Sequence, residues 1–283
     1  TDPVQYELFS DEGIIDVPYY PVPQPEAPVS FAAIGSIADG ISVLVKQESG
    51  VEYYASFSED GTTFSDDTLI DPAHPEFDGM PANIVVYVRV KAFNGSEFSE
   101  PSEILAASTG VPGPDILLVN AFDRETAGNT YDFVCQHGGA IDTYSYSFSS
   151  ATNDAVQDSL VNLQMYPVVD YILGEESSGT VTLDEHDQQL LKDFLNHGGR
   201  LFISGSELGW HLDHLGSYSD REFYYNYLKA QYVQDAPNDL VSTYYDVNAV
   251  TDELFESVSS FQFDDGTHGT YDVAYPDVIE GIN

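Results

Sequence analysis

Basic residues, cysteine and tryptophan are all scarce in this sequence. Lys and Arg number 8 against 48 Asp and Glu in 283 residues, which gives a formal net charge of −40. A surface with this charge repels phosphate backbones and anionic lipid headgroups, so we expect no nucleic-acid partner. The single cysteine, Cys135, cannot form an internal disulfide, and it excludes metal sites of the CxxC type.

Long apolar runs are absent as well. No stretch approaches the about 20 residues that a helix needs to cross a bilayer, so we expect no membrane span. The chain begins with Thr1-Asp2-Pro3 and has no signal peptide, which is typical of a mature or excised start and leaves the compartment open. Hydrophobic residues still make up 42% of the chain, which excludes a disordered protein, and its length predicts roughly two domains.

The acidic excess has two interpretations. It is either a solvated surface selected in salty, halophilic or marine surroundings, or a source of oxygen ligands for calcium. Calcium ligands would come from the acidic segments 65–67, 71–78 and 264–266. None of these matches the calcium-loop pattern of alternating acids followed by a glutamate, so the composition favours the salt interpretation.

Proline and strand patterns organise the first part of the chain. Residues 1–28 are rich in Pro-x-Pro spacing, which indicates a linker or the tail of an upstream domain. Residues 29–110 alternate apolar and polar side chains, as in Ile84 to Lys91, and Asp60-Gly61 and Asn94-Gly95 supply hairpin turns. Short alternating strands without a helical period predict a β-sandwich.

This region resembles a fibronectin type III domain. The segment 86–95, followed by 99–103, is similar to the last two strands of that family, and 58–64 is similar to its central hairpin. The resemblance implies a spacer or binding platform, because such domains carry no fixed function.

Beyond Val111-Pro112-Gly113-Pro114 the pattern changes to strands alternating with helices. Buried strands are predicted near 115–120, 143–149, 168–173 and 200–204, and helices near 126–137, after a capping box at 182–185, and from 219 or 220. This alternation predicts a three-layer α/β domain over 111–283 with a flavodoxin-like parallel sheet. The short, stiff boundary predicts two halves that fold separately.

A strand order of 2-1-3-4-5 would bring together the loops after strands one, three and four. These loops carry Asp123 and Arg124, then Glu175, Glu176 and Ser177, then Ser206 and Glu207. Carboxylates, one base and hydroxyls would share one cleft, which could bind a sugar hydroxyl or a cation, or orient water.

The turn after the fourth strand resembles a nucleophile elbow, and the whole α/β part resembles the class I glutamine amidotransferase-like superfamily. That family places a catalytic cysteine at the position of Ser206, whereas Cys135 lies in a predicted helix as a core thiol. A serine hydrolase would use Ser206 as nucleophile, His268 as base and Glu175 or Glu176 as the orienting acid.

Two further sets of residues are candidates. Glu207, His211 and His214, with Asp213 between them, have the spacing of one helical face and would suit zinc. Surface residues beside a cleft would give the same pattern. Trp210, the only tryptophan, is interpreted as a core or rim anchor, and sugar stacking is the alternative.

A narrower resemblance covers nearly all of 29–283. Segments 171–177, 198–205, 209–213, 220–224 and 263–272 are similar to secreted bacterial proteins labelled xanthan lyase or N-acetylmuramoyl-L-alanine amidase, in which a fibronectin type III module precedes this domain. It implies a secreted or cell-surface protein with neighbouring domains, and an α/β domain truncated soon after Asp277.

Two functions remain open from the sequence. The first is a non-catalytic spacer or binding region of a protein that processes polysaccharide or cell-wall glycan. The second is a serine-dependent hydrolase of an ester or amide on such a glycan. No cofactor is expected, and calcium or zinc would be the metals if one binds.

Overall fold

The computed structural model describes residues 4–10, 13–19, 23–110, 113–122, 132–176, 183–237, 246–250, 255–258, 260–263, 267, 273 and 275–282. Four predicted site residues, Asp123, Arg124, Ser177 and His268, lie outside these ranges, as does the acidic segment 264–266. No helix in the described part has both the length and the apolar character to cross a membrane.

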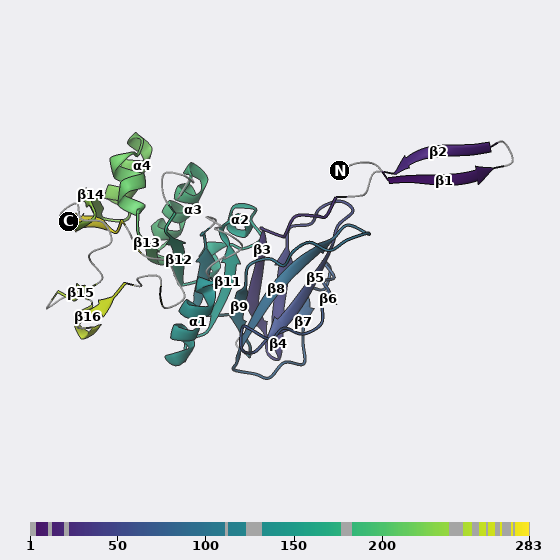
Figure 1. The fold of residues 1–283 in the computed structure, drawn as a ribbon. Coiled ribbons are helices and arrows are strands. Elements are labelled where there is room, and N and C mark those ends of the chain that lie inside the picture. Colours follow the sequence, from purple (N-terminus) through teal and green to yellow (C-terminus); the bar gives the residue numbers. More distant parts are fainter. Residues whose placement is uncertain are drawn as a thin grey trace.

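A β-hairpin precedes the main body of the molecule. Strands β1 (Val4–Ser10) and β2 (Gly13–Tyr19) pair antiparallel with each other, and Figure 1 shows the hairpin standing clear of the other sheets. Residues 23–29 then run without regular secondary structure. The prolines predicted a linker over this whole segment, but Pro18 lies near the end of a two-stranded ribbon, where a missing N–H is tolerated.

Two antiparallel sheets follow and face each other. One contains β3 (Phe31–Ile37), β4 (Gly40–Val45) and β7 (Glu76–Phe77); the other has the order β6-β5-β8-β9, formed by β5 (Glu52–Ser58), β6 (Thr68–Leu69), β8 (Val85–Phe93) and β9 (Leu105–Ser108). The inward residues of β8, Val86, Val88 and Val90, are buried while their neighbours are half-exposed. The described chain is mostly sheet, and this part is consistent with the predicted fibronectin type III-like sandwich.

Four parallel strands form the α/β part. These are β10 (Ile116–Asn120), β11 (Phe148–Thr152), β12 (Val168–Gly174) and β13 (Arg200–Gly205), in the order β13-β12-β10-β11. Counted along the chain this is 2-1-3-4, the predicted order. The next strand, β14 (Ala230–Asp235), departs from the prediction, because it pairs with β17 (Asp277–Gly281) in a separate two-stranded sheet.

Helices lie on both faces of the parallel strands. Helices α2 (Asn153–Gln157), α3 (Glu185–Asn196) and α4 (Tyr218–Asn226) share a core with one face, whereas α1 (Phe133–Thr143) packs on the other. Short elements complete the fold: η1 (Leu163–Met165), the π-helical turn η2 (Trp210–His214), β15 (Asp246–Asn248), η4 (Glu256–Val258) and β16 (Ser260–Gln262). The N-cap of α3 is Asp184, whose side chain accepts a hydrogen bond from the backbone N–H of Asp187. The predicted capping box began two residues earlier, at 182.

The position of α1 corrects one sequence prediction. A helix stop was expected at Gly138-Gly139, yet α1 continues to Thr143, and the following strand starts at Phe148 rather than 143. A Cβ atom on Gly138 would lie 2.5 Å from Cζ of Phe148. Glycine therefore serves here to let the helix approach the sheet, and it does not end the helix.

One of the two sandwich sheets is continuous with the parallel strands. Strand β11 pairs antiparallel with β3, so a seven-stranded sheet runs from β13 to β7 (Figure 1). The Ser150 hydroxyl donates to the carbonyl of Ala106 at 2.6 Å and accepts its N–H at 2.8 Å. Leu118, Val134 and Phe148 belong to the core of the sandwich. The expectation of two separately folding halves is therefore at odds with the structure, because each half would expose a shared core.

Candidate functional site

A cleft of about 460 Å³ lies at the carboxyl ends of β12 and β13. Helix α1 forms one wall and the C-terminal strand β17 forms another. The lining residues are Phe133, Gln136, His137, Ile172, Gly174, Ile203, Ser204, Gly205, Ser206, Leu208, Gly209, Tyr224, Phe263, Val273, Pro276, Asp277 and Ile279. This is the edge of a parallel sheet where ligands are generally bound.

The turns after β12 and β13 meet at this edge, as the strand order predicted. The backbone N–H of Ser206 donates to the carbonyl of Gly174 at 2.9 Å, and its hydroxyl lies 3.4 Å from the same oxygen. Gly174 has φ +56°, and a Cβ atom there would lie 2.7 Å from the Phe122 ring, so the turn requires glycine. Because Gly174 is bonded to Glu175, Ser206 and Glu175 lie in adjacent turns.

The predicted carboxylates are not the ones that line the cleft. Glu175, Glu176 and Glu207 are absent from its walls, and Glu176 is only 2% exposed. Asp277, which sequence reasoning did not select as a site residue, occupies that place. Residue 277 is far from the strand-end loops in sequence, and only the pairing of β17 with β14 brings it to the cleft.

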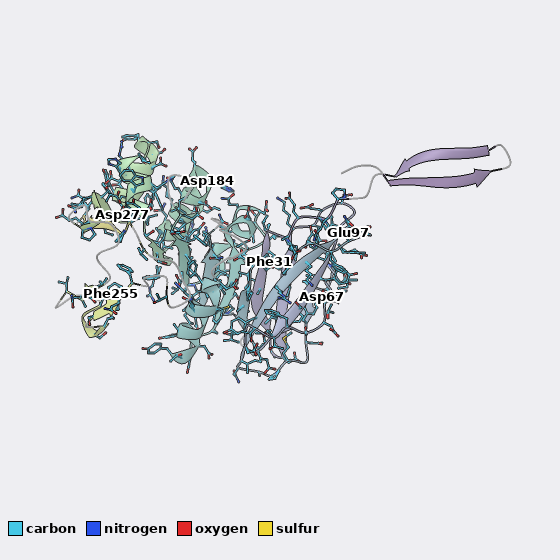
Figure 2. All side chains as sticks on the ribbon, in the orientation of Figure 1. Phe31, Asp67, Glu97, Asp184, Phe255 and Asp277 are labelled. Atoms are coloured by element: carbon cyan, nitrogen blue, oxygen red, sulfur yellow. The ribbon has the colours of Figure 1, made fainter. Side chains whose placement is uncertain are left out.

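Asp277 ties the C-terminal strand to the turn after β13. Its backbone N–H donates to the carbonyl of Ser206 at 2.8 Å, and its Oδ2 accepts the N–H of Trp210 at 2.8 Å. Burial raises the pKa of Asp277 to about 7, and the nearby Glu207 and Asp235 add to the rise. Figure 2 shows Asp277 beside β14, at the opposite end of the body from the sandwich.

Two polar atoms beneath this region have no partner in the described part of the chain. They are Oδ1 of Asp277 and the hydroxyl of Tyr224, a residue that is 1% exposed. A Cβ atom on Gly209 would lie 2.8 Å from that hydroxyl and 3.2 Å from Oδ2 of Asp277, so only glycine fits between them. Buried polar groups without partners each cost about 1–3 kcal/mol, so these two atoms lower the stability of the fold.

A histidine–carboxylate pair stands on the α1 side of the cleft. Nδ1 of His137 lies 2.7 Å from Oδ2 of Asp170, a residue of β12 that is 8% exposed. Oδ1 of Asp170 has no partner among the described residues. Sequence reasoning missed this pair, although an aspartate inside the buried run of β12 was a signal that could have found it.

The predicted zinc ligands do not form a metal site. Asp213 uses both carboxylate oxygens, accepting from the Tyr225 hydroxyl at 2.6 Å and from the Tyr232 N–H at 2.8 Å. His214 stacks on Trp210, whereas Nδ1 of His211 is buried without a partner and burial lowers the pKa of His211. Within the described ranges, no three His, Cys, Asp or Glu side chains are grouped to hold a metal ion.

Trp210 lies outside the cleft walls. Its ring is 4.3 Å from that of His214 in a stacked arrangement and 6.0 Å from that of Tyr232. One face of the indole is therefore covered, and the residue acts through its backbone N–H, which holds Asp277. This agrees with the interpretation of Trp210 as an anchor and leaves less room for stacking on a sugar.

Ser206 lacks two features of a nucleophile elbow. Its hydroxyl interacts with a carbonyl, and no described histidine bonds to it. It is also missing from the non-glycine residues with positive φ in the described ranges, although elbows hold their nucleophile in a strained turn. Cys135 is half-buried and lies outside the buried core, and burial raises the pKa of its thiol to about 12.

Comparison with known proteins gives little beyond this geometry. No protein-family model matches the chain, and no curated protein matches it. Among solved structures, domains d3–d4 of the rat CD45 extracellular region are 14% identical with a TM-score of 0.27, and they align over 38% of this chain and 64% of that one. Chicken CNTN1 FN1–FN3 domains are 15% identical with a TM-score of 0.29, and they align over 40% of this chain and 44% of that one.

A purple acid phosphatase from yellow lupin seeds is 11% identical with a TM-score of 0.23, over 70% of this chain and 38% of that one. The chain thus covers less than two thirds of each of these three structures. Likenesses with TM-scores this low carry no argument about fold or chemistry, so the assignment below rests on the site.

Proposed function

We propose that the chain is a saccharide-binding and spacing region of a secreted or cell-surface bacterial protein that processes polysaccharide or cell-wall glycan. The sugar binds in the cleft at the carboxyl edge of β12 and β13. The observation that carries the proposal is the make-up of this cleft, which combines apolar walls with a few hydroxyl and ring groups.

The cleft walls match the two sides of a sugar ring. Ile203 and Ile279 offer apolar surface for the C–H faces of a pyranose, while Ser204, Ser206 and His137 offer hydrogen-bonding groups for its hydroxyls. A volume of about 460 Å³ accommodates one or two sugar units.

Charge restricts the glycan further. The described lining of the cleft contains no Lys or Arg, and the chain as a whole has a net charge of −40. A uronate or sulfated polymer would be repelled before and after docking. The sugar that fits is therefore uncharged.

The parallel strands support a flavodoxin-like α/β unit in this proposal. Their 2-1-3-4 order and the helices on both faces agree with that architecture, although β14 pairs outside the sheet. A relation to glutamine amidotransferases has less support, because Ser206 stands where the nucleophilic cysteine would be and Cys135 lies in α1.

Calorimetric titration with neutral and anionic oligosaccharides tests the proposal. The probes are xylohexaose, cellohexaose and chitohexaose, with an oligogalacturonate as the charged comparison. We expect one of the neutral probes to bind and the oligogalacturonate not to bind. Failure of every neutral probe, or preference for the anionic one, would refute the assignment.

A pair of exposed residues on neighbouring strands supplies matched variants. Ile279 lines the cleft and is 56% exposed, while Val233 is 49% exposed and lies outside it. We expect Ile279→Trp to narrow the cleft and weaken binding at least about tenfold, or about 1.4 kcal/mol. Val233→Trp adds the same ring nearby and should leave affinity unchanged; equal losses in both variants would argue against the cleft.

The alternative function is serine-dependent hydrolysis of an ester or amide on a glycan or peptidoglycan substrate. It needs a base beside Ser206, and the base that the sequence suggested, His268, lies outside the described residues. The described contacts of Ser206 favour the binding function.

A further inference from the structure

One side chain in the cleft is built for proton transfer. His137 projects from α1 into the cleft, and its side chain is 27% exposed, so solvent or a ligand reaches it. Its Nδ1 is engaged by Asp170, and among the described residues Nε2 has no hydrogen-bond partner. A ring fixed at one nitrogen and open at the other is the arrangement of a general base.

The carboxylate behind His137 is fixed in turn. Asp170 lies in the middle of β12, paired with Leu118 of β10 and Phe202 of β13, and its side chain is 11% exposed. An aspartate in the centre of a parallel sheet is expensive, because an ionised carboxylate loses its hydration there. Its contact with Nδ1 keeps the proton on that nitrogen and directs the lone pair of Nε2 outward.

We propose that His137, held by Asp170, is a general base that activates water to hydrolyse a carboxylic ester on the saccharide bound in the cleft. This inference rests on the proposed saccharide binding and adds an activity to it. His137 is the catalytic residue, and Asp170 is a positioning residue because it acts through the imidazole ring.

The reaction needs no further reagent. Nε2 of His137 takes a proton from water while the water oxygen bonds to the ester carbonyl carbon, and the carbonyl electron pair moves to its oxygen. When the C=O bond forms again, the bond to the sugar oxygen breaks, and that oxygen takes the proton back from Nε2. The products are a carboxylic acid and a free sugar hydroxyl, which balances one ester and one water.

An ester and water are selected over the alternatives on three grounds. Glycosidic cleavage uses two carboxyl groups that flank the bond, whereas the described lining of the cleft includes Asp277 as its one carboxyl group. An alkoxide also leaves more readily than an amide nitrogen. Water is the nucleophile because the Ser206 hydroxyl faces the carbonyl of Gly174 and not His137.

The test measures acetate release from O-acetylated xylohexaose by the full chain, with kcat and KM determined separately. We expect turnover by the wild type and a fall in kcat of at least about 100-fold in His137→Ala, with a rise in KM of no more than about tenfold from the lost hydrogen bond to the sugar. Asp170→Asn should lower kcat while KM is retained. The control is His74→Gln, an exposed histidine of the sandwich, which should turn over like the wild type.

Two readouts separate a chemical role from a structural one. Added imidazole should restore part of the turnover of His137→Ala, which no loss of packing would allow. Mass spectra of the acid-quenched reaction should show no acetyl group on the chain. An unchanged melting temperature in His137→Ala, with xylohexaose still bound and weakened only by the loss of one hydrogen bond, would show that the cleft is intact.

The possible failures are distinguishable. A wild type that binds xylohexaose but releases no acetate overturns the inference and leaves the proposed function standing. Equal kcat in His137→Ala and the wild type, or an acetyl group on Ser206, also overturns it. Absence of binding to every neutral probe defeats the proposed function itself.

Discussion

Replacing Asp277 by asparagine tests whether a buried carboxylate at the cleft lowers stability at neutral pH. Asparagine has the shape of the protonated acid and keeps an oxygen for the N–H of Trp210, which Oδ2 now accepts at 2.8 Å. It removes the negative charge that Glu207 and Asp235 oppose, and it leaves the neighbouring Tyr224 hydroxyl in place.

The direction of the pH dependence follows from whether the folded or the unfolded chain binds the proton of Asp277 more tightly. The pKa of Asp277 is about 7 in the folded chain against 3.8 for the ordinary carboxyl, so protonation favours the folded state. Above about pH 7 the carboxylate is ionised in both states and its full penalty is present. As the pH falls from about 7 to about 4 the penalty disappears, because the folded state takes up the proton first.

The magnitude comes from the same difference. At about 1.4 kcal/mol per pH unit, this pKa difference corresponds to a destabilisation of about 4 kcal/mol for a carboxylate that is fully shielded from solvent. Solvent reaches part of the side chain and screens it, so we expect about 2 kcal/mol. The melting temperature of Asp277→Asn should then exceed that of the wild type by about 4–8 °C at pH 8.

The assay is thermal unfolding of the wild type and the variant at pH 4, 6 and 8, compared at each pH. The gain should be largest at pH 8 and close to zero at pH 4. Asp66→Asn, at an exposed position, is the control. It should leave the melting temperature unchanged at each pH. A variant less stable than the wild type at pH 8, or an equal gain at pH 4 and pH 8, would refute the reasoning.

Three other outcomes follow from the fold. Phe148→Ala should lower the free energy of unfolding by about 3–5 kcal/mol, because the ring is fully buried in the core that the sandwich and the α/β part share. Probes in both parts should report one common transition at a lower melting temperature, and separate transitions would contradict this. Fragments 29–110 and 111–283 should each be poorly folded by circular dichroism, since β3 and β11 lose their pairing; a cooperative transition in either alone would count against the shared sheet. The melting temperature should rise from low to molar NaCl, because counterions relieve the repulsion of a chain with net charge −40; a flat profile would disfavour the salt interpretation of the acidity.

Local patterns predicted most of the elements in the described chain. Alternation in β8 and the continuous apolar run of β10 identified their strands, because burial on one face or on both leaves a direct trace in the sequence. The order of the four parallel strands agrees with the flavodoxin-like order assumed from the sequence, which the alternation of strands and helices suggests but does not fix. Gly138 misled the prediction, because a glycine chosen for close packing looks the same as one that ends a helix.

Long-range pairings were beyond the sequence. Nothing in β3 or β11 shows that they pair with each other, since neither segment carries a pattern that is specific to that pairing. Asp277 likewise reaches the cleft only because β17 folds back on β14. The roles suggested for Asp123, Arg124, Ser177 and His268 stay predictions.

The central claim is that the cleft between α1, β13 and β17 holds an uncharged sugar, and a crystal structure of the chain with a bound neutral oligosaccharide tests it most directly. We expect the sugar in contact with His137 and Ser206, with its ring against Ile279. An oligosaccharide bound only on the sandwich, with the cleft empty, would contradict the account.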